Sequence, residues 1–391
     1  MTFIIKIKNM KKKHFLVLIL AIIIVLSTTL LINHYSQSKA QPEIIKIGVT
    51  IPLSGKYAYI GQEIANGLQM AAEEINNQSK LNNNQIKLII EDNKGETTEA
   101  INSVNKFINV DRVEIVISTF THITSAIKEL TKANNKILFY MSTTPVFAQE
   151  SKYIFRDYFD AADSGRKIAE AVKAKGFQGV ALLTEISEQG QIIEDSFKAA
   201  ANELGLQIVV QEEVPADLTD LKTSLLKLNL PNADVLVTDN WRQEHILMTQ
   251  LKELDLLGVP TFHIVAPYLP ISNTPEMKAI YQENQAISTW YGMAEATDKE
   301  KQIEFKVKYK LKYDQEPTAD AAYAYDDIYL IAQALKMCDF DAADKDCFSQ
   351  AIVSSQLDGV GGHLEFDQDG VSKRYVPLIQ VLDGKWQEIE L

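Results

Sequence analysis

The pattern of apolar and polar residues near position 44 predicts a short buried strand followed by a long helix. Residues 44–51 form a β-branched apolar run with Lys46 as its one charge, which is typical of a strand covered on both faces of a parallel sheet. Pro52 and Gly55 end the strand. From Gly61 onward, apolar residues recur at the spacing of one helical face: Ile64, Leu68, Ala71, Ala72 and Ile75. Polar residues are expected on the other faces: Gln62, Glu63, Asn66, Glu73 and Glu74.

The same alternation of strand and helix continues along the chain. Further strands are predicted at residues 86–91, 113–118, 136–141, 179–184, 207–211, 234–238 and 261–265. Between most of them lie apolar helical stripes: Ile101, Val104 and Ile108; Ile168 and Val172; Ile193, Phe197, Ala200 and Leu204; Leu221, Leu225 and Leu228. This order predicts an α/β fold of parallel sheets with right-handed crossovers and helices on both faces. The units are too many for one ordinary sheet, so two doubly wound lobes are expected.

Composition supports two cores and disfavours a nucleic-acid partner. The chain is 46% hydrophobic, and the about 350 residues after position 40 can bury two cores. Residues 1–40 hold six lysines and no acidic residue, so the rest carries a net charge of −19, compared with −13 for the whole chain. Binding a phosphate backbone requires a basic face, and no basic run follows residue 40.

The N-terminus has the pattern of an export segment. Five lysines between Lys6 and Lys13 precede an apolar run over residues 15–32. At about 18 residues, this run is long for a signal-peptide core and just long enough to span a bilayer. Residues 38–40 offer a small-residue cleavage site, and no cysteine lies nearby for a lipoprotein anchor. Residues 1–40 are therefore a signal peptide or an uncleaved N-terminal membrane anchor; a buried core helix is the third alternative, which the lysines disfavour.

Several motifs, in this order, resemble the type I periplasmic solute-binding proteins, in particular the branched-chain amino acid (Leu/Ile/Val) binding family of ABC importers. They lie at residues 44–76, 91–96, 98–108, 153–156, 322–327 and 358–370. Each motif alone is weak, but together they span residues 44–390. The resemblance implies two lobes joined by a hinge of three crossovers, near Asp160, residues 288–291 and Tyr375. Lobe 1 would comprise residues 44–159 plus 290–374, and lobe 2 residues 160–289 plus 375–391.

Two hydroxyl-rich loops are the first candidates for holding a ligand. Residues 118–125 follow a strand and begin a helix, where free N–H groups and the positive helix end favour a carboxylate. The segment matches the family's carboxylate-binding loop, with Thr119, Thr121 and His122 as candidates; ordinary N-capping is the alternative. Residues 141–145 match the loop that contacts a bound amino acid, with Ser142 and Thr143 in register, although such hydroxyls also form turns.

The second lobe departs from the family pattern. Gln189 stands where the family has an aromatic residue before a glycine, and Asn240, Trp241 and Arg242 follow a strand where it has a tyrosine. The resemblance places Tyr268 at the acidic residue that would pair with a ligand ammonium. Asp239 and Glu188 could replace that acid. Because an unpaired buried charge is costly, an ordinary branched-chain amino acid is disfavoured as the ligand.

Aromatic side chains could also form part of the cleft. Trp241 with Arg242 could stack on a planar ligand or clamp a second carboxylate, or could simply pack locally beside a solvated arginine. Tyr57 and Tyr59 could close over the ligand or only edge the cleft.

Cys338 and Cys347 are the only cysteines, and a disulfide is expected if the compartment is oxidising; two free thiols are the alternative. No further cysteine or histidine stands near them, which disfavours a metal site. The nucleophile elbow, the phosphate loop and the dinucleotide fingerprint are absent from the sequence, so neither an enzyme nor a cofactor is expected.

The sequence thus favours an extracytoplasmic protein, expected to be a monomer, that binds a small polar organic solute such as an amino acid or carboxylate. It would present its closed form to an ABC permease in the membrane. A membrane-anchored ligand-sensing receptor domain of the same fold is the alternative. The sequence identifies neither the solute nor the choice between transport and sensing.

Overall fold

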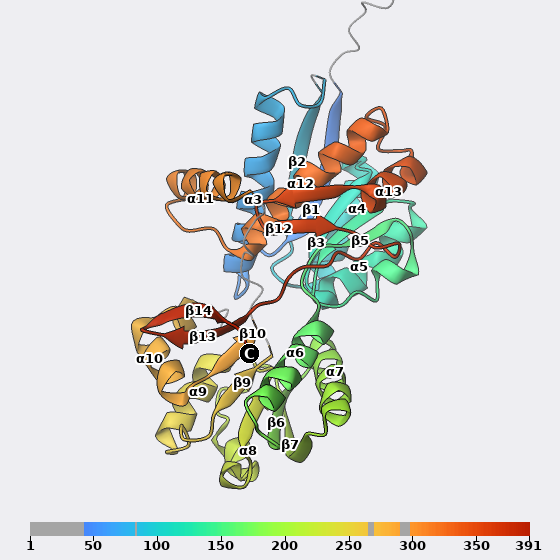
Figure 1. Ribbon diagram of the computed structural model, residues 1–391. Coiled ribbons are helices and arrows are strands. Elements are labelled where there is room, and N and C mark those ends of the chain that lie inside the picture. The colour runs from blue at the N-terminus through green and yellow to red at the C-terminus, as the bar shows by residue number, and fades with distance from the viewer. Residues whose placement is uncertain (1–42, 83, 265–269, 290–297) are drawn as a thin grey trace, which may run out of the picture.

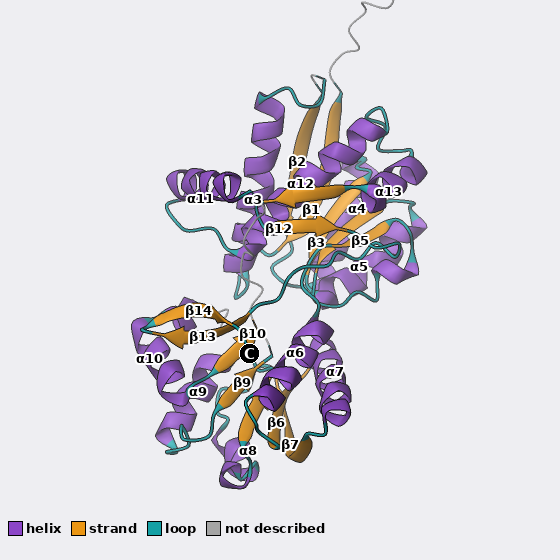
Figure 2. Ribbon diagram, viewed as in Figure 1, coloured by secondary structure: helices purple, strands orange, loops and turns teal. Residues whose placement is uncertain are grey.

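The structure is a computed structural model that describes residues 43–82, 84–264, 270–289 and 298–391. Two lobes lie one above the other, each built around its own sheet (Figure 1; Figure 2). Among the described residues, no helix is both long and apolar enough to cross a membrane. The predicted signal peptide or anchor, residues 1–40, lies outside the described part of the chain.

The upper lobe contains a five-stranded parallel sheet in the order β2-β1-β3-β4-β5. Its strands are β1 Ile44–Ile51, β2 Gln85–Asp92, β3 Ile115–Thr119, β4 Ile137–Met141 and β5 Ile154–Arg156. A small antiparallel ribbon, β11 Gln356–Gly359 with β12 Gly362–Glu365, lies in the same lobe (Figure 1).

The lower lobe contains a seven-stranded sheet in the order β14-β13-β10-β9-β8-β6-β7. Its strands are β6 Gly179–Ile186, β7 Gln207–Pro215, β8 Val235–Thr238, β9 Thr261–His263, β10 Ile287–Thr289, β13 Leu378–Leu382 and β14 Lys385–Ile389. The strands from β7 to β10 pair in parallel, whereas β13 and β14 add an antiparallel edge. The sheet was predicted to be parallel throughout, so this edge is a difference from the expectation.

Helices cover both faces of each sheet. In the upper lobe they are α3 Ala58–Asn77, α4 Thr97–Lys106, α5 Thr121–Ala133, α11 Lys299–Tyr313, α12 Ala319–Met337 and α13 Lys345–Ser354, with a π-helical turn at Phe107–Asp111. In the lower lobe they are α6 Ala161–Ala174, α7 Glu188–Leu204, α8 Lys222–Lys227, α9 Glu244–Glu253 and α10 Pro275–Asn284. Short 3₁₀ turns lie at Ala148–Glu150, Leu230–Asn232 and Pro270–Asn273.

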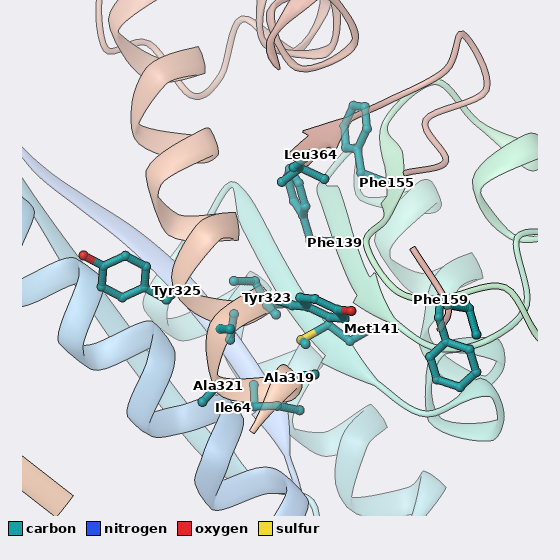
Figure 3. Packing of buried hydrophobic residues seen from close by; sticks show 14 of the residues in the cluster. Ile64, Phe139, Met141, Phe155, Phe159, Ala319, Ala321, Tyr323, Tyr325 and Leu364 are labelled. Atoms are coloured by element: carbon teal, nitrogen blue, oxygen red, sulfur yellow. The ribbon is translucent and has the colours of Figure 1, made fainter. Parts of the chain in front are cut away.

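The two-residue period of the strands explains this layering. In β3, Ile115 and Ile117 join the core under α3 and α12, and Val116 between them joins the core under α4 and α5. Figure 3 shows the first of these cores, where side chains from α3, α12, β4 and β12 converge. In the lower lobe, Val180 and Leu182 face α6 and α7, while Ala181 faces the helices opposite. The predicted α/β fold of two doubly wound lobes is confirmed.

The predicted strands are all present, with boundaries shifted by a few residues. Helix α3 begins at Ala58 instead of near Gly61, so Tyr57 is its N-cap and Tyr59 lies in its first turn. The apolar stripe of α3 is buried as predicted. Glu63 and Asn66, expected on its outer faces, are also buried, because α11 and the start of α12 pack over that side.

The predicted stripe of α4 is only partly correct. Val104 is buried as predicted, but Ile101 remains 37% exposed, and Ala100 and Phe107, the latter in the π-helical turn, are buried beside Val104. The ring of Phe107 fills the space beside Gly48, where a Cβ atom would lie 2.6 Å from Phe107 Cδ2. This close approach orients α4 on the sheet.

A disulfide joins Cys338, at the end of α12, to Cys347 in α13, with the two Cα atoms 5.8 Å apart. No free cysteine occurs among the described residues.

Candidate functional site

A small cavity of about 50 Å³ lies where the carboxyl ends of strands from both lobes meet. The upper lobe contributes Ile60, Thr119, Phe120, Thr121, Met141, Ser142, Thr143, Tyr158 and Phe159, and the lower lobe contributes Gln189 and Trp241. The structure therefore brings together six of the predicted site residues: Thr119, Thr121, Ser142, Thr143, Gln189 and Trp241.

The turn between β3 and α5 forms one wall of the cavity. Phe120 has a positive φ of 66°, which turns the chain directly from the strand into the helix at Thr121. The Thr119 hydroxyl donates to the Met141 carbonyl at 3.0 Å and so ties β3 to β4. No side chain caps α5, so the predicted alternative of N-capping is not what this structure shows. Thr121, the first residue of α5, lines the cavity, so the helix begins at this wall, and the N–H groups of its first turn have no partner within the helix.

The loop after β4 supplies two buried hydroxyl groups. Ser142 is 3% exposed and Thr143 is 6% exposed, and neither hydroxyl has a hydrogen-bond partner in the described structure. Buried polar groups are normally paired, because leaving one unpaired costs about 1–3 kcal/mol. Both unpaired hydroxyls belong to residues that line the cavity.

Arg156 holds this loop in place from behind. Its Nε donates to the Ser142 carbonyl at 3.1 Å, and its Nη2 donates to the carbonyls of Thr143 at 3.4 Å and Phe159 at 2.7 Å. The guanidinium is completely buried, and this burial lowers its pKa from the usual range. The carbonyls of the loop are thereby occupied, and its hydroxyls remain available.

The lower-lobe wall contains fewer binding groups than predicted. The Asn240 side chain hydrogen-bonds to its own neighbours: its Oδ1 accepts from the Thr238 hydroxyl at 2.9 Å, and its Nδ2 donates to Gln243 Oε1 at 3.0 Å. Asp239 accepts the backbone N–H of Glu185 at 2.7 Å, and burial raises the pKa of Asp239 well above its usual range. A carboxyl group that favours its neutral form is a poor partner for an ammonium.

Arg242 makes a bridge from the lower lobe to the upper lobe. Its guanidinium forms an ion pair with the buried carboxylate of Glu185, and its Nε donates to the Tyr57 hydroxyl at 3.1 Å. The same guanidinium lies 4.3 Å from the centre of the Trp241 ring. Trp241 and Arg242 therefore pack on each other locally, but Arg242 is paired with Glu185 and is not a solvated arginine. Stacking on a planar ligand or clamping of a second carboxylate stays a prediction.

The remaining predicted residues lie away from this cavity. The His122 side chain is exposed, with Nε2 3.1 Å from the Gly95 carbonyl oxygen and its ring stacked on Phe120. Tyr57 and Tyr59 line a neighbouring hollow of about 240 Å³. Tyr268 lies outside the described residues. No group of three or more potential metal ligands occurs within the described ranges.

Sequence reasoning missed Tyr158 and Phe159, which line the cavity just after β5. Both follow the 153–156 motif directly, at the carboxyl end of a strand, which is the position where ligand contacts are expected in such sheets. It also missed Glu185, the partner of Arg242, because nothing local marks a pair 57 positions apart.

The paired lobes with a lined cavity between them define the class of protein as a two-lobed binding protein. A family model described as "Periplasmic binding protein" matches residues 44–385. The chain belongs to this family, and it is a solute-binding protein and not an enzyme. The predicted resemblance is confirmed at this level.

Similar proteins agree with this assignment. Leu/Ile/Val-binding protein homolog 7 from Brucella suis is 23% identical over 373 residues, which cover 89% of this chain and 90% of that protein. A branched-chain amino acid transporter substrate binding protein from Streptococcus pneumoniae, in complex with isoleucine, is 24% identical with a TM-score of 0.76 over 88% of this chain and 98% of that one. A solute binding protein from Rhodopseudomonas palustris, in complex with 3,4-dihydroxybenzoic acid, is 21% identical with a TM-score of 0.77 over 89% and 96%.

Proposed function

We propose that this chain is the extracytoplasmic solute-binding protein of an ABC importer and that it binds a small carboxylate in the cavity between its lobes. Family membership supports the transport role. The ligands named for structures of the same fold support the chemistry, since isoleucine, leucine, 3,4-dihydroxybenzoic acid and benzoate all carry a carboxyl group. Export, a permease partner and a monomeric state are parts of the same proposal.

The observation that carries the proposal is the pair of unpartnered hydroxyls of Ser142 and Thr143 beside the uncapped start of α5. Hydroxyl donors and helical N–H groups both stabilise an anion, and the positive end of the helix dipole adds to this. A carboxylate bound here would satisfy both hydroxyls at once.

The lining also bears on the kind of carboxylate. No acidic side chain lines the cavity among the described residues. The nearby Glu185 is paired with Arg242, and Asp239 favours its neutral form. The walls include the rings of Phe120, Tyr158, Phe159 and Trp241. We therefore propose a carboxylate with an apolar or aromatic body and no ammonium group.

Thermal unfolding of the purified protein with a panel of carboxylates tests this proposal, because a ligand that binds only the folded state raises Tm. We expect a rise with benzoate, 3,4-dihydroxybenzoate or phenylacetate, and little with leucine or isoleucine. The Ser142→Ala/Thr143→Val variant should lose most of the rise, because the anion donors are gone. Thr223→Val, on the exposed side of α8, is the matched control.

The outcomes separate the parts of the proposal. A rise with leucine or isoleucine alone would mean that an ammonium partner exists and that the carboxylate is part of an amino acid. An equal rise in both variants would place the ligand elsewhere. No rise with any carboxylate would contradict the proposed ligand class.

A membrane-anchored ligand-sensing domain is the second candidate function, favoured by the length of the apolar run over residues 15–32. N-terminal sequencing of the exported protein distinguishes the two. Cleavage after Ala40 with release from the membrane would support the solute-binding protein of an importer. An intact N-terminus in the membrane fraction would remain compatible with the sensing domain.

A further inference from the structure

The cavity is separated from a second hollow by a thin partition of side chains. Trp241 lines the cavity of about 50 Å³ on one side and the hollow of about 240 Å³ on the other. Tyr57 and Arg242 line only the second hollow. Tyr57, Trp241 and Arg242 together form this partition.

The partition is held rigidly by contacts from both lobes. Arg242 lies over the Trp241 ring and donates to the Tyr57 hydroxyl at 3.1 Å, while buried Glu185 anchors its guanidinium. The Tyr57 ring contacts the Phe120 ring at a centroid distance of 5.1 Å. Trp241 is 8% exposed although it stands between two hollows. Arg242, which lies over the Trp241 ring, can move away only by breaking its ion pair with Glu185 or its hydrogen bond to Tyr57, so the ring is confined on that side.

The two hollows differ in chemistry. The cavity is lined by hydroxyls and rings, whereas the second hollow is edged by the charged groups of Lys56, Asp217 and Arg242. A molecule long enough to occupy both would place its carboxylate at Ser142 and Thr143 and its far end beyond Trp241. Because Trp241 lines both hollows, it stands at the boundary between them.

We infer that the partition, and Trp241 above all, sets the upper limit on the length of the carboxylate that the cleft accepts. This inference deepens the proposed function and rests on it. The expected selectivity is for a body of about one ring, because the void in front of Trp241 holds only a few water-sized positions. Longer carboxylates are excluded by a steric wall, which is a stronger discriminator than a lost contact.

Binding constants for benzoate, 3-phenylpropanoate and 5-phenylpentanoate, measured by calorimetry, test the inference. The native protein should prefer benzoate and reject 5-phenylpentanoate. In Trp241→Ala, benzoate should bind about tenfold more weakly because it loses a wall, and 5-phenylpentanoate at least tenfold more tightly because the two hollows merge. Trp386→Ala, which removes an indole on β14 that packs against Tyr281 and lines neither hollow, should keep the native order. The same order in Trp241→Ala as in the native protein would overturn the inference.

A second measurement separates failure of the inference from failure of the proposed function. If the native protein binds none of these carboxylates, the proposed function is wrong. Whether Trp241 limits access to the cavity is then tested by the rate at which a cysteine in the cavity is labelled. Gln189→Cys places a thiol in the cavity, and both native cysteines are in a disulfide. Adding Trp241→Ala should raise the labelling rate by pyrenylmaleimide relative to N-ethylmaleimide about tenfold, and adding Trp386→Ala should not. An unchanged ratio would show that Trp241 is not the barrier.

Discussion

Asp326 is one of several charged residues buried where the chain passes between the lobes. Its carboxylate accepts backbone N–H groups from Val360 at 2.8 Å and Gly361 at 2.9 Å. Arg374 lies nearby and forms its closest ion pair with Asp157. Burial raises the pKa of Asp326 to about 6, although Arg374 and the two N–H groups oppose the shift. The charged form of Asp326 is therefore less favourable in the folded protein than in the unfolded chain.

This raised pKa predicts a pH-dependent loss of stability. Because the folded pKa lies above the unfolded value of 3.8, the contribution of Asp326 is fully present below pH 4 and is lost as the pH rises through about 6. Asp326→Asn removes this titration. The unfolding free energy of the native protein, minus that of Asp326→Asn, should fall by up to about 3 kcal/mol between pH 4 and pH 7.

Urea denaturation at several pH values measures the difference. Asp341→Asn, on an exposed turn outside the charged cluster, is the control and should show no such trend. A difference that is flat, or that grows with pH, would mean that Asp326 stays ionised in the folded protein.

Individual residues also show where sequence reasoning succeeds. Ser142 and Thr143 could be found because a strand end and a loop are local features. Glu63 could not, since its partners, Tyr309 at 2.8 Å and Gln315 at 2.6 Å, come from about 250 positions later in the chain. Hydrophobic periodicity reports apolar burial only, and a carboxylate buried by distant hydroxyl and amide donors leaves no periodic signal.

At the scale of elements, α3 and α12 pack so closely that one glycine decides their separation. A Cβ atom on Gly67 would lie 2.1 Å from the Ala321 carbonyl oxygen. Gly67→Ala should therefore destabilise the protein by about 1–3 kcal/mol, because the helices must move apart, even though alanine favours a helix by about 1 kcal/mol. Gly258→Ala is the control, since a Cβ atom there meets nothing within 4 Å. Equal midpoints in urea for both variants would contradict this close packing.

The disulfide between α12 and α13 is the second device at this scale. It closes a short loop between residues 9 positions apart in the sequence. By lowering the conformational entropy of the unfolded chain, a crosslink of this length stabilises the folded protein by about 2–3 kcal/mol. Replacing both cysteines by serine should lower the unfolding free energy by that amount. Carboxylate binding should not change, because neither cysteine lines the cavity. A loss of binding at full stability would show that the disulfide acts on the cleft instead.

The length of the apolar run in the sequence explains much of which strands are predicted. Strands β1, β2 and β6 span 8 residues each and show clear apolar runs, so all three are predicted. Strands β5 and β10 have 3 residues each, too few to show a period, and β14 has mostly polar residues on an edge. Strand β9 is equally short, but it is predicted because Ile264 and Val265 extend its apolar pattern in the sequence. The antiparallel edge of the lower sheet could not be derived from alternating strand–helix units, because β13 and β14 follow each other without a helix between them.

For the whole molecule, the chain path supports a division into two discontinuous lobes. The last strands, β13 and β14, complete the lower sheet after the chain has returned from the upper lobe (Figure 1). We propose that lobe 1 comprises residues 44–159 plus 290–374 and lobe 2 residues 160–289 plus 375–391. The middle crossing is predicted near residues 288–291, and residues 290–297 lie outside the described structure. Rigid lobes on such connections can close on a ligand as a hinge.

The Tyr57–Arg242 hydrogen bond joins the two lobes directly, so it should favour the closed form. Tyr57→Phe removes only the hydroxyl and keeps the ring against Phe120. A hydrogen bond to a charged group contributes about 1.5 kcal/mol or more, so the ratio of open to closed molecules should rise about tenfold. Tyr153→Phe is the control, because its hydroxyl donates to Asp346 within the upper lobe.

Energy transfer between dyes on Val110→Cys and Leu226→Cys, exposed positions in the upper and lower lobes, reports this ratio. Neither dye position makes the bond that is removed or lines the hollow beside it, so a change in transfer reports lobe movement and not a local effect. If Tyr57→Phe and Tyr153→Phe leave the same distribution, the bond does not bias closure. If only Tyr57→Phe shifts it toward the open form, the ligand must supply the missing differential affinity, and its apparent affinity should weaken in proportion to the closed fraction that is lost.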